Sequence, residues 1–170
     1  ALPILLFVAH RDEIILQAQR TFIRMKPDAH TGLYNGSRQD QADWLFASVQ
    51  TLGRDSHLRQ FSPDHFDYIV VDDLDDDEMC RSEARVREMT KWVKEALFGC
   101  FGGKEGRFIM VGNLISKNSV LAAMTRSKGM HVSQVNILDK QGNVSWAAKW
   151  TREEVQQMAD FMGYRSFQKE

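Results

Sequence analysis

The sequence predicts one α/β domain over residues 1–170, with three layers and a mostly parallel sheet. Short runs of β-branched, aromatic and aliphatic residues at 4–9, 66–71 and 107–112 are typical of strands buried on both faces. Segments with helical patterns separate these runs, and strands that alternate with helices indicate a sheet covered by helices on both sides. A chain of 170 residues is also the size of a single domain with a substantial core.

Each element is expected from its own local pattern. The first helix follows the first strand, carries Asp12 and Glu13 in its first turn, and ends at Lys26 and Pro27. The expected strands are 4–9, 32–36, 44–49, 66–73, 107–112, 132–138 and 144–147. The expected helical segments are 10–26, 50–60, 79–98, 116–127 and 151–163.

The C-terminal part is expected to hold a β-hairpin and a helix. Residues 132–138 and 144–147 look like two strands joined by the turn residues 139–143. Thr151 and Glu154 have the spacing of a capping box, so a last helix begins there and ends near Gly163. We expect residues 132–138 to pair with the strand at 107–112. The alternative is a homodimer, in which a second copy pairs with that open sheet edge.

The charge balance excludes a strongly basic nucleic-acid-binding protein. Lys and Arg number 22 against 23 for Asp and Glu, but residues 72–78 concentrate six carboxylates in seven positions. Cys80 and Cys100 flank a predicted helix and are too far apart to bridge, which favours a reducing, cytoplasmic location. No apolar run reaches the length of a membrane span, so no membrane partner is expected.

Two acids follow the central apolar strand. Asp72 and Asp73 end the run that begins at Phe66, and ligands of open α/β sheets bind at the carboxyl ends of the strands. The run resembles the Walker B element of P-loop NTPases. That resemblance implies that Asp72 holds Mg²⁺ and that Asp73 polarises the water that attacks ATP. A solvated acidic turn is a simpler explanation of these acids than a Walker B element. Adventitious cation binding by Asp73, Asp75 and Asp77 is a further alternative.

Residues 5–72 resemble superfamily 2 helicases of the DEAD/DEAH and type III restriction kind. Phe7-Val8-Ala9-His10-Arg11 is similar to their motif Ia, and 45–52 to a later phosphate-contacting segment. The resemblance implies that Arg11, Gln50 and Thr51 contact DNA. The acidic motif departs from the family, which has Asp-Glu followed by His or Asp where this chain has Asp72-Asp73-Leu74-Asp75.

Residues 68–170 resemble the ATPase domain of phage large terminases, which package DNA. Met110-Val111-Gly112-Asn113 is similar to the coupling segment of that family, so Asn113 is expected where the state of the bound nucleotide is sensed. The terminase segment usually has Gly-Thr in place of Gly112-Asn113. Both families share the RecA-like core, and a natural or engineered chimera with a junction near 68–75 explains the two resemblances together.

A phosphate-binding P-loop is missing from the 170 residues. The motif Gly-x-x-x-x-Gly-Lys-Ser/Thr has one lookalike, Gly102-Gly103-Lys104-Glu105, which has Phe98 at the first glycine position and follows a predicted helix. The sequence therefore supports two hypotheses. The chain is a partial RecA-like domain of a DNA-translocating ATPase, with Mg²⁺ and ATP as the cofactors of the parent families, or it is a catalytically silent folded domain.

Overall fold

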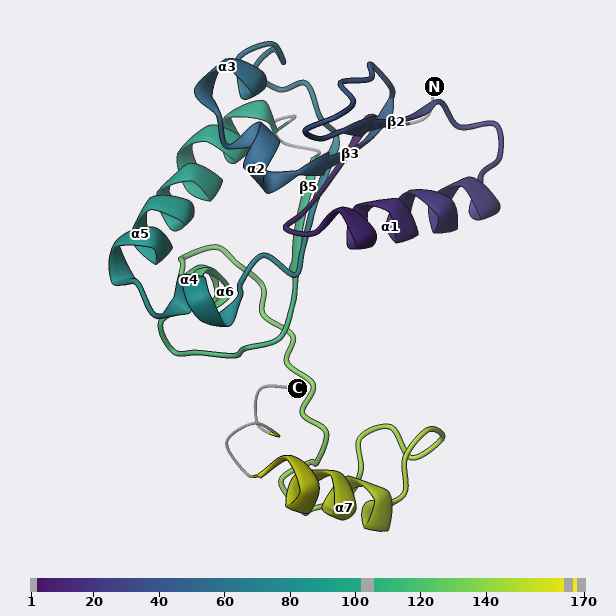
Figure 1. Cartoon of the computed structure of the whole chain (residues 1–170), viewed down its shortest axis with the longest axis vertical. Helices are drawn as coiled ribbons and strands as arrows, with labels where there is room; N and C mark the ends of the chain where they lie inside the picture. The colour runs from purple at the N-terminus through teal and green to yellow at the C-terminus, as the bar shows by residue number, and fades with distance from the viewer. Residues whose placement is uncertain (1–2, 102–105, 164–166, 168–170) are drawn as a thin grey trace.

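A parallel sheet of five strands forms the centre of the domain (Figure 1). The structure is a computed structural model that describes residues 3–101, 106–163 and 167. The strand order is β2-β3-β1-β4-β5, with every pair parallel. The strands are β1 (Leu5–Ala9), β2 (Thr31–Tyr34), β3 (Trp44–Ser48), β4 (Tyr68–Asp72) and β5 (Arg107–Val111). The predicted three-layer α/β fold with a parallel sheet is confirmed.

The central strands are buried because their side chains are apolar on both faces. All five residues of β1 are buried, and Phe7 lies in register with Phe46 of β3 and Val70 of β4. Because side chains alternate along a strand, Leu6 and Val8 enter one core cluster while Phe7 enters the other. The position of β4, between β1 and β5, confirms the prediction for the strand that ends in Asp72.

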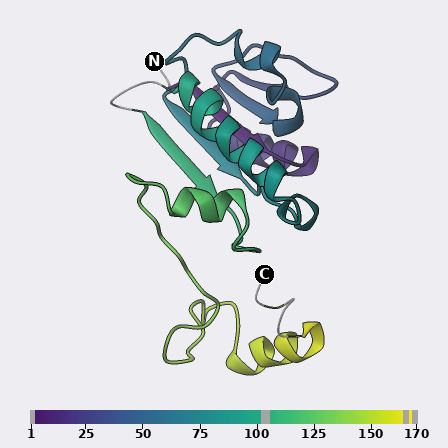
Figure 2. The ribbon, with the colours of Figure 1, turned by 90° about the vertical axis from the view of Figure 1, so that its left-hand side faces the viewer.

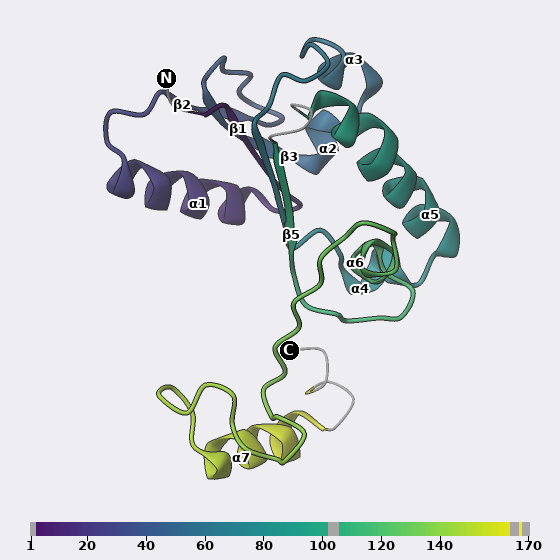
Figure 3. The same ribbon diagram turned by 180° about the vertical axis from the view of Figure 1, so that it is seen from behind.

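One face of the sheet is covered by α1 (Asp12–Met25), as Figure 3 shows. Its Phe22 ring packs edge-on against Phe46 and Trp44 of β3, with centroids 5.4 and 5.6 Å apart. Ile15 on the same side of the helix is fully buried. The helix therefore closes the layer over β3 and β1.

The opposite face is covered by short helices around a longer one, α5 (Figure 2). They are α2 (Val49–Leu52), α3 (Asp55–Leu58), α4 (Asp77–Cys80), α5 (Glu83–Trp92), η1 (Val93–Leu97), η2 (Phe98–Cys100) and α6 (Val120–Thr125). The single helix expected over 79–98 is wrong, because α4 ends at Cys80 and the Ser82 side chain accepts a hydrogen bond from the Arg85 amide to cap a new helix. The helix expected over 50–60 is divided into α2 and α3, and the helix expected over 116–127 is shortened to α6. The two cysteines, Cys80 and Cys100, are both buried and form no disulfide.

The expected C-terminal β-hairpin is not formed. Within the described residues the two segments share one antiparallel bridge, between Leu138 and Val144, around a turn in which Asp139 accepts from the Gln141 and Asn143 amides. The second segment cannot extend because the amides of Lys149 and Trp150 donate to the Trp146 carbonyl and curl the chain.

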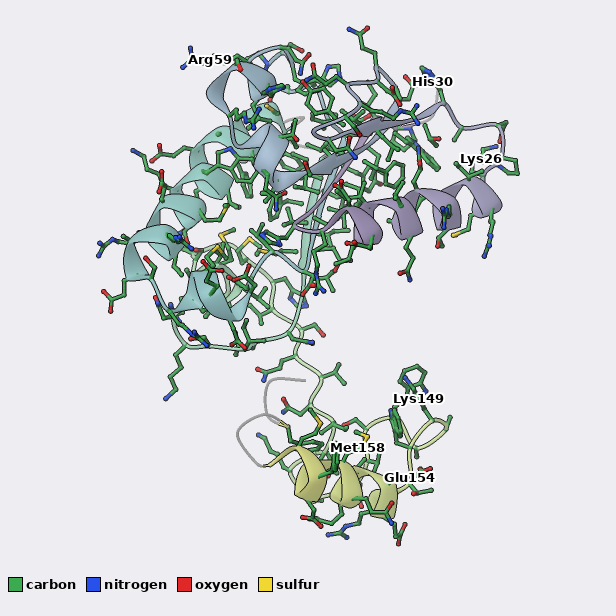
Figure 4. The ribbon with its side chains drawn as sticks, viewed as in Figure 1. Lys26, His30, Arg59, Lys149, Glu154 and Met158 are labelled. Atoms are coloured by element: carbon green, nitrogen blue, oxygen red, sulfur yellow. The ribbon has the colours of Figure 1, made fainter. Side chains whose placement is uncertain are left out.

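The last helix, α7 (Arg152–Met162), forms as expected. Thr151 and Glu154 make the capping box, with both reciprocal hydrogen bonds present. The helix and the turn before it lie away from the sheet (Figure 1), and residues 132–138 do not pair with β5. In this part of the molecule Lys149 lies 5.0 Å from the Trp146 and Trp150 ring centres, beside the helix that carries Glu154 and Met158 (Figure 4).

Candidate functional site

The carboxyl ends of four parallel strands bring the predicted site residues to one edge of the sheet. In the register, Ala9 of β1 lies opposite both Ser48 of β3 and Asp72 of β4, and Asp72 lies opposite Val111 of β5. The residues that follow these strand ends therefore share one edge, where ligands of open α/β sheets bind. The sequence pattern predicted this position for Asp72 and Asp73, and the family resemblances supplied the other candidate residues.

Asp72 is the last residue of the central strand, and its carboxyl is half-buried. Burial, reinforced by the neighbouring charge of Asp73, raises the pKa of Asp72 above its ordinary value. By alternation Asp72 projects on the same face as Tyr68 and Val70, the face that α1 covers. Within the described part of the chain, no Lys, Arg or His forms an ion pair with it.

Asp73 turns the chain sharply at the end of β4. Its φ of 47° lies in the left-handed region, which Asp tolerates better than most side chains. Its amide donates to the Val111 carbonyl at 3.1 Å, so the turn continues the ladder with β5. Its carboxylate accepts a hydrogen bond from Arg11 Nη2 at 3.0 Å. Two residues assigned to different roles by resemblance are thus in direct contact.

The other acids of the run have structural partners. Asp75 accepts hydrogen bonds from the backbone amides of Val120 and Leu121, at 2.7 and 2.8 Å, and so holds the first turn of α6. Asp76 accepts from the Met79 amide at 2.6 Å as the N-cap of α4. No cluster of three or more His, Cys, Asp or Glu side chains suited to a metal ion occurs among the described residues. The alternating Asp73, Asp75 and Asp77 do not form a cation loop there.

The three residues expected to contact DNA lie near this edge but differ in exposure. Arg11 precedes α1 and is exposed, and exposed Gln50 donates to the His10 carbonyl at 2.7 Å. Thr51 is only 5% exposed, and its hydroxyl accepts a hydrogen bond from the Ser48 hydroxyl at 2.8 Å. Arg11 and Gln50 can therefore meet a phosphate, whereas the Thr51 hydroxyl is turned inward.

Asn113 lies beside the acidic turn. It lines a small crevice with Asp73, Asp75, Gly112 and Leu121, and its own side chain is exposed. Its expected role in sensing the bound nucleotide stays a prediction. The glycine-lysine lookalike at 102–105 lies outside the described residues.

The acidic pair has the donor chemistry of a magnesium site. Mg²⁺ prefers carboxylate oxygens and is usually held by one or two of them, with water and phosphate oxygens completing the shell. Asp72 supplies a half-buried carboxyl that is destabilised in its charged form, and Asp73 follows it directly. A divalent cation at Asp72 would relieve that unfavourable charge, so the residues present fit the ion.

Comparison with known families identifies the first half of the chain. Residues 3–93, more than half of the sequence, match the family described as type III restriction enzyme, res subunit. The chain belongs to this family. The match supports a superfamily 2 helicase-like P-loop fold. No curated protein matches the chain.

The res-subunit match contains most of the candidate site. Arg11, Gln50, Thr51, Asp72 and Asp73 all fall inside it, and only Asn113 lies beyond it. The matched range includes residues 68–75, the position of the expected chimeric junction. The terminase resemblance of the second half stays a prediction. In the described part of the chain, no helix has the length and apolarity that a membrane span requires.

Sequence reasoning missed two contributors to this edge. The Nε2 atom of His10 lies 3.6 Å from Asp76 Oδ2, which links the end of β1 to the start of α4. Asp75 anchors a helix that begins 45 residues later in the chain. No local pattern signals either contact, because both depend on how distant segments meet at the sheet edge.

Proposed function

We propose that this chain carries the acidic half of the ATPase site of a DNA-translocating, helicase-type protein. The observation that carries the proposal is the Asp72 carboxyl, half-buried at the end of the central strand with a raised pKa. An acid kept in an environment that disfavours its charge is a functional-site candidate, because a bound cation offsets the cost. Asp72 would coordinate Mg²⁺, which would bind the phosphates of ATP.

Asp73 would orient the attacking water. Its carboxylate lies one residue beyond Asp72 and is held by Arg11 at 3.0 Å. An Asp at this position reaches one methylene less far than the Glu of the resembling family, so the water would have to lie closer to the strand end. Asn113, in the same crevice, would sense the bound nucleotide.

DNA is the partner that this proposal implies. Arg11 and Gln50 are exposed at the carboxyl edge, where they would contact phosphates of the nucleic-acid backbone. Such contacts position the protein on DNA and carry no sequence preference. Arg11 would then link the DNA contact to Asp73, which it already binds.

The 170 residues on their own are proposed to hydrolyse no ATP. Their sequence contains no Gly-x-x-x-x-Gly-Lys-Ser/Thr, the motif whose backbone amides cradle the β- and γ-phosphates. The second candidate function follows from the same observation: a catalytically silent folded domain, of chimeric or other recombined origin with a terminase-like second half. The family match, whose range includes residues 68–75, supports the first candidate.

Equilibrium binding of labelled ATP in the presence of Mg²⁺, combined with a phosphate-release assay, tests the proposal. We expect no phosphate release, and weak ATP binding that requires Mg²⁺ and is lost in Asp72→Asn. Glu153→Gln, an exposed acid in α7, is the matched control and should bind as the wild type does. Absence of Mg²⁺-dependent binding would favour the silent domain. Phosphate release that is lost in Asp72→Ala would overturn the proposed inactivity.

A further inference from the structure

The side chain of Tyr34 is buried at the end of β2, where its hydroxyl meets two polar groups from a later segment. Tyr34 is only 3% exposed. Its hydroxyl oxygen lies 2.6 Å from His57 Nδ1 and accepts a hydrogen bond from Gln60 Nε2. His57 lies in α3, and Gln60 follows that helix by two residues. These three residues, called the Tyr34 network below, therefore join α3 to β2.

The partners of Gln60 determine the direction of each hydrogen bond in the Tyr34 network. Gln60 Nε2 also donates to the His57 carbonyl at 2.8 Å, and a carbonyl can only accept, so the amide nitrogen and not the amide oxygen lies here. The Tyr34 oxygen therefore accepts from Gln60. Among the described residues, the acceptor for the proton of Tyr34 is His57 Nδ1. Since a nitrogen that accepts carries no proton, the network requires a neutral His57 ring with its proton on Nε2.

Protonation of His57 is incompatible with this arrangement. The added proton enters at Nδ1, the atom to which the Tyr34 hydroxyl donates, so the Tyr34 oxygen must then accept from both neighbours or move away. If it accepts from both, the hydroxyl proton of Tyr34 has no acceptor within the network. A buried donor without an acceptor is unfavourable, and Tyr34 is buried. The neutral ring therefore favours contact between α3 and β2, and the protonated ring favours their separation.

Three elements that contact α3 add no charge to the Tyr34 network. They are β2, α2 and η2, and none of them contains Asp, Glu, Lys or Arg. In the described part of the chain, no carboxylate forms an ion pair with His57. The charged and titratable residues in the segment around His57 are Arg54, Asp55, Arg59, Asp64 and His65. Both arginines have the sign of a protonated ring, so they do not stabilise it.

We propose that the Tyr34 network is a pH-sensitive switch, which holds α3 against β2 while His57 is neutral and releases α3 when His57 binds a proton. An imidazole ordinarily takes up its proton at about pH 6.5, so the change falls between neutral and mildly acidic pH. α3 closely follows α2, the helix that carries Gln50 at the carboxyl edge of the sheet. Release of α3 would loosen that side of the edge. The proposal does not rest on the proposed ATPase function.

Amide hydrogen exchange at two pH values tests the switch on the full 170-residue chain. The amides of His57 and Phe61 donate to the carbonyls of Arg54 and Leu58, at 2.9 and 3.1 Å, so both report on this segment. We expect their protection factors, corrected for the pH dependence of exchange itself, to fall about tenfold between about pH 7.5 and about pH 5.5. At the higher pH, long-range ¹H–¹⁵N spectra should show the His57 ring protonated at Nε2 alone.

Matched substitutions identify the titrating group. His57→Asn places a neutral amide oxygen near the position of Nδ1 and should abolish the fall in protection at acidic pH. Tyr34→Phe keeps the ring but removes the hydroxyl, and it should give low protection at both pH values. His65→Gln is the control, because His65 packs on Phe61 with ring centroids 5.4 Å apart and lies outside the Tyr34 network. It should leave the fall unchanged.

Four results would each overturn the proposal. They are equal protection of the wild-type amides at the two pH values, a fall that persists in His57→Asn, a fall that disappears in His65→Gln, and a His57 ring protonated at Nδ1 at the higher pH. The third result would assign the pH dependence to His65.

Discussion

Arg11 Nη2 donates a hydrogen bond to Asp73 Oδ2 at 3.0 Å, and this contact joins residues 62 positions apart across the carboxyl edge of the sheet. Arg11 precedes α1, and Asp73 follows the central strand. The side chain of Arg11 is 65% exposed, so its guanidinium also reaches solvent. In the proposed function, a DNA phosphate would therefore compete with the Asp73 carboxylate for the same donors. This contact would couple DNA binding to the acidic site in the proposed function.

Substitution of Arg11 should weaken DNA binding. We expect Arg11→Ala to lower the affinity for a single-stranded oligonucleotide, and to reduce the slope of log K against log salt by roughly 0.7 if one phosphate contact is lost. Fluorescence anisotropy over a series of salt concentrations measures both quantities. Arg20→Ala removes an exposed arginine within α1 and is the control. Equal losses of DNA affinity in the two variants would mean that Arg11 contributes only its positive charge and makes no specific phosphate contact.

Removal of the Asp72 charge should stabilise the fold at neutral pH. Because the pKa of Asp72 is raised in the folded state by burial and by Asp73, the folded chain holds this proton more tightly than the unfolded chain does. Stability from this group is therefore greatest below the ordinary Asp value and falls as pH rises through the folded-state pKa. We expect Asp72→Asn to raise the melting temperature at pH 7, with a smaller gain near pH 4. A lower melting temperature at pH 7 would show that the charged form is favoured in the fold.

The Asp75 carboxylate should matter for stability and not for cation binding. It accepts from the Val120 and Leu121 amides, and the loss of a cap of this kind typically costs about 1 to 2 kcal/mol. Urea unfolding of Asp75→Ala should show that loss. Glu78→Ala removes an exposed acid paired with Arg85 and should change the free energy of unfolding by less than about 1 kcal/mol. Equal changes in the two variants would exclude the capping role.

The left-handed backbone at Asp73 should restrict which residues are tolerated there. With φ at 47°, a β-branched side chain clashes with its own backbone, at a cost of about 1 to 2 kcal/mol. We therefore expect Asp73→Val to lower the free energy of unfolding by roughly that amount relative to Asp73→Asn, which loses the same charge but tolerates the conformation. Chemical denaturation of the two variants measures the difference. Equal stabilities would mean that the turn relaxes.

The sheet could be predicted from sequence because its signal is local. The strands at Leu5, Trp44, Tyr68 and Arg107 are continuous apolar runs, and such runs are typical of parallel sheets, although the β5 strand at Arg107 is not buried on both faces. The same pattern predicted that Asp72 ends a central strand with a parallel strand on each side. Arg11 and Asp73 could not be paired in advance, because that contact depends on the register of β1 against β4.

The failures have identifiable physical causes. Residues 132–138 alternate like a strand, but an alternating segment forms one only where a partner pairs its backbone, and the described residues provide none beyond Leu138. The helix expected over 79–98 contains Ser82, whose hydroxyl caps a new helix more favourably than it continues the old one. Ser82 followed by Glu83 is a sequence signal for the start of a helix. The DNA contact expected for Thr51 stays a prediction, and the sequence did not show that the Ser48 hydroxyl donates a hydrogen bond to the buried Thr51 hydroxyl.

Titration of the chain with Mg²⁺, observed through the side-chain carboxyl ¹³C resonances of its aspartates, tests whether the acidic pair is a cation site. We expect the Asp72 resonance, and to a smaller extent that of Asp73, to move along a single saturable curve. The pKa of Asp72 should fall as Mg²⁺ binds, and Asp72→Asn should abolish the curve while Asp75→Asn preserves it. An Asp72 resonance that does not move with Mg²⁺, or a curve that survives in Asp72→Asn, would rule out the metal-binding role on which the proposed ATPase function rests.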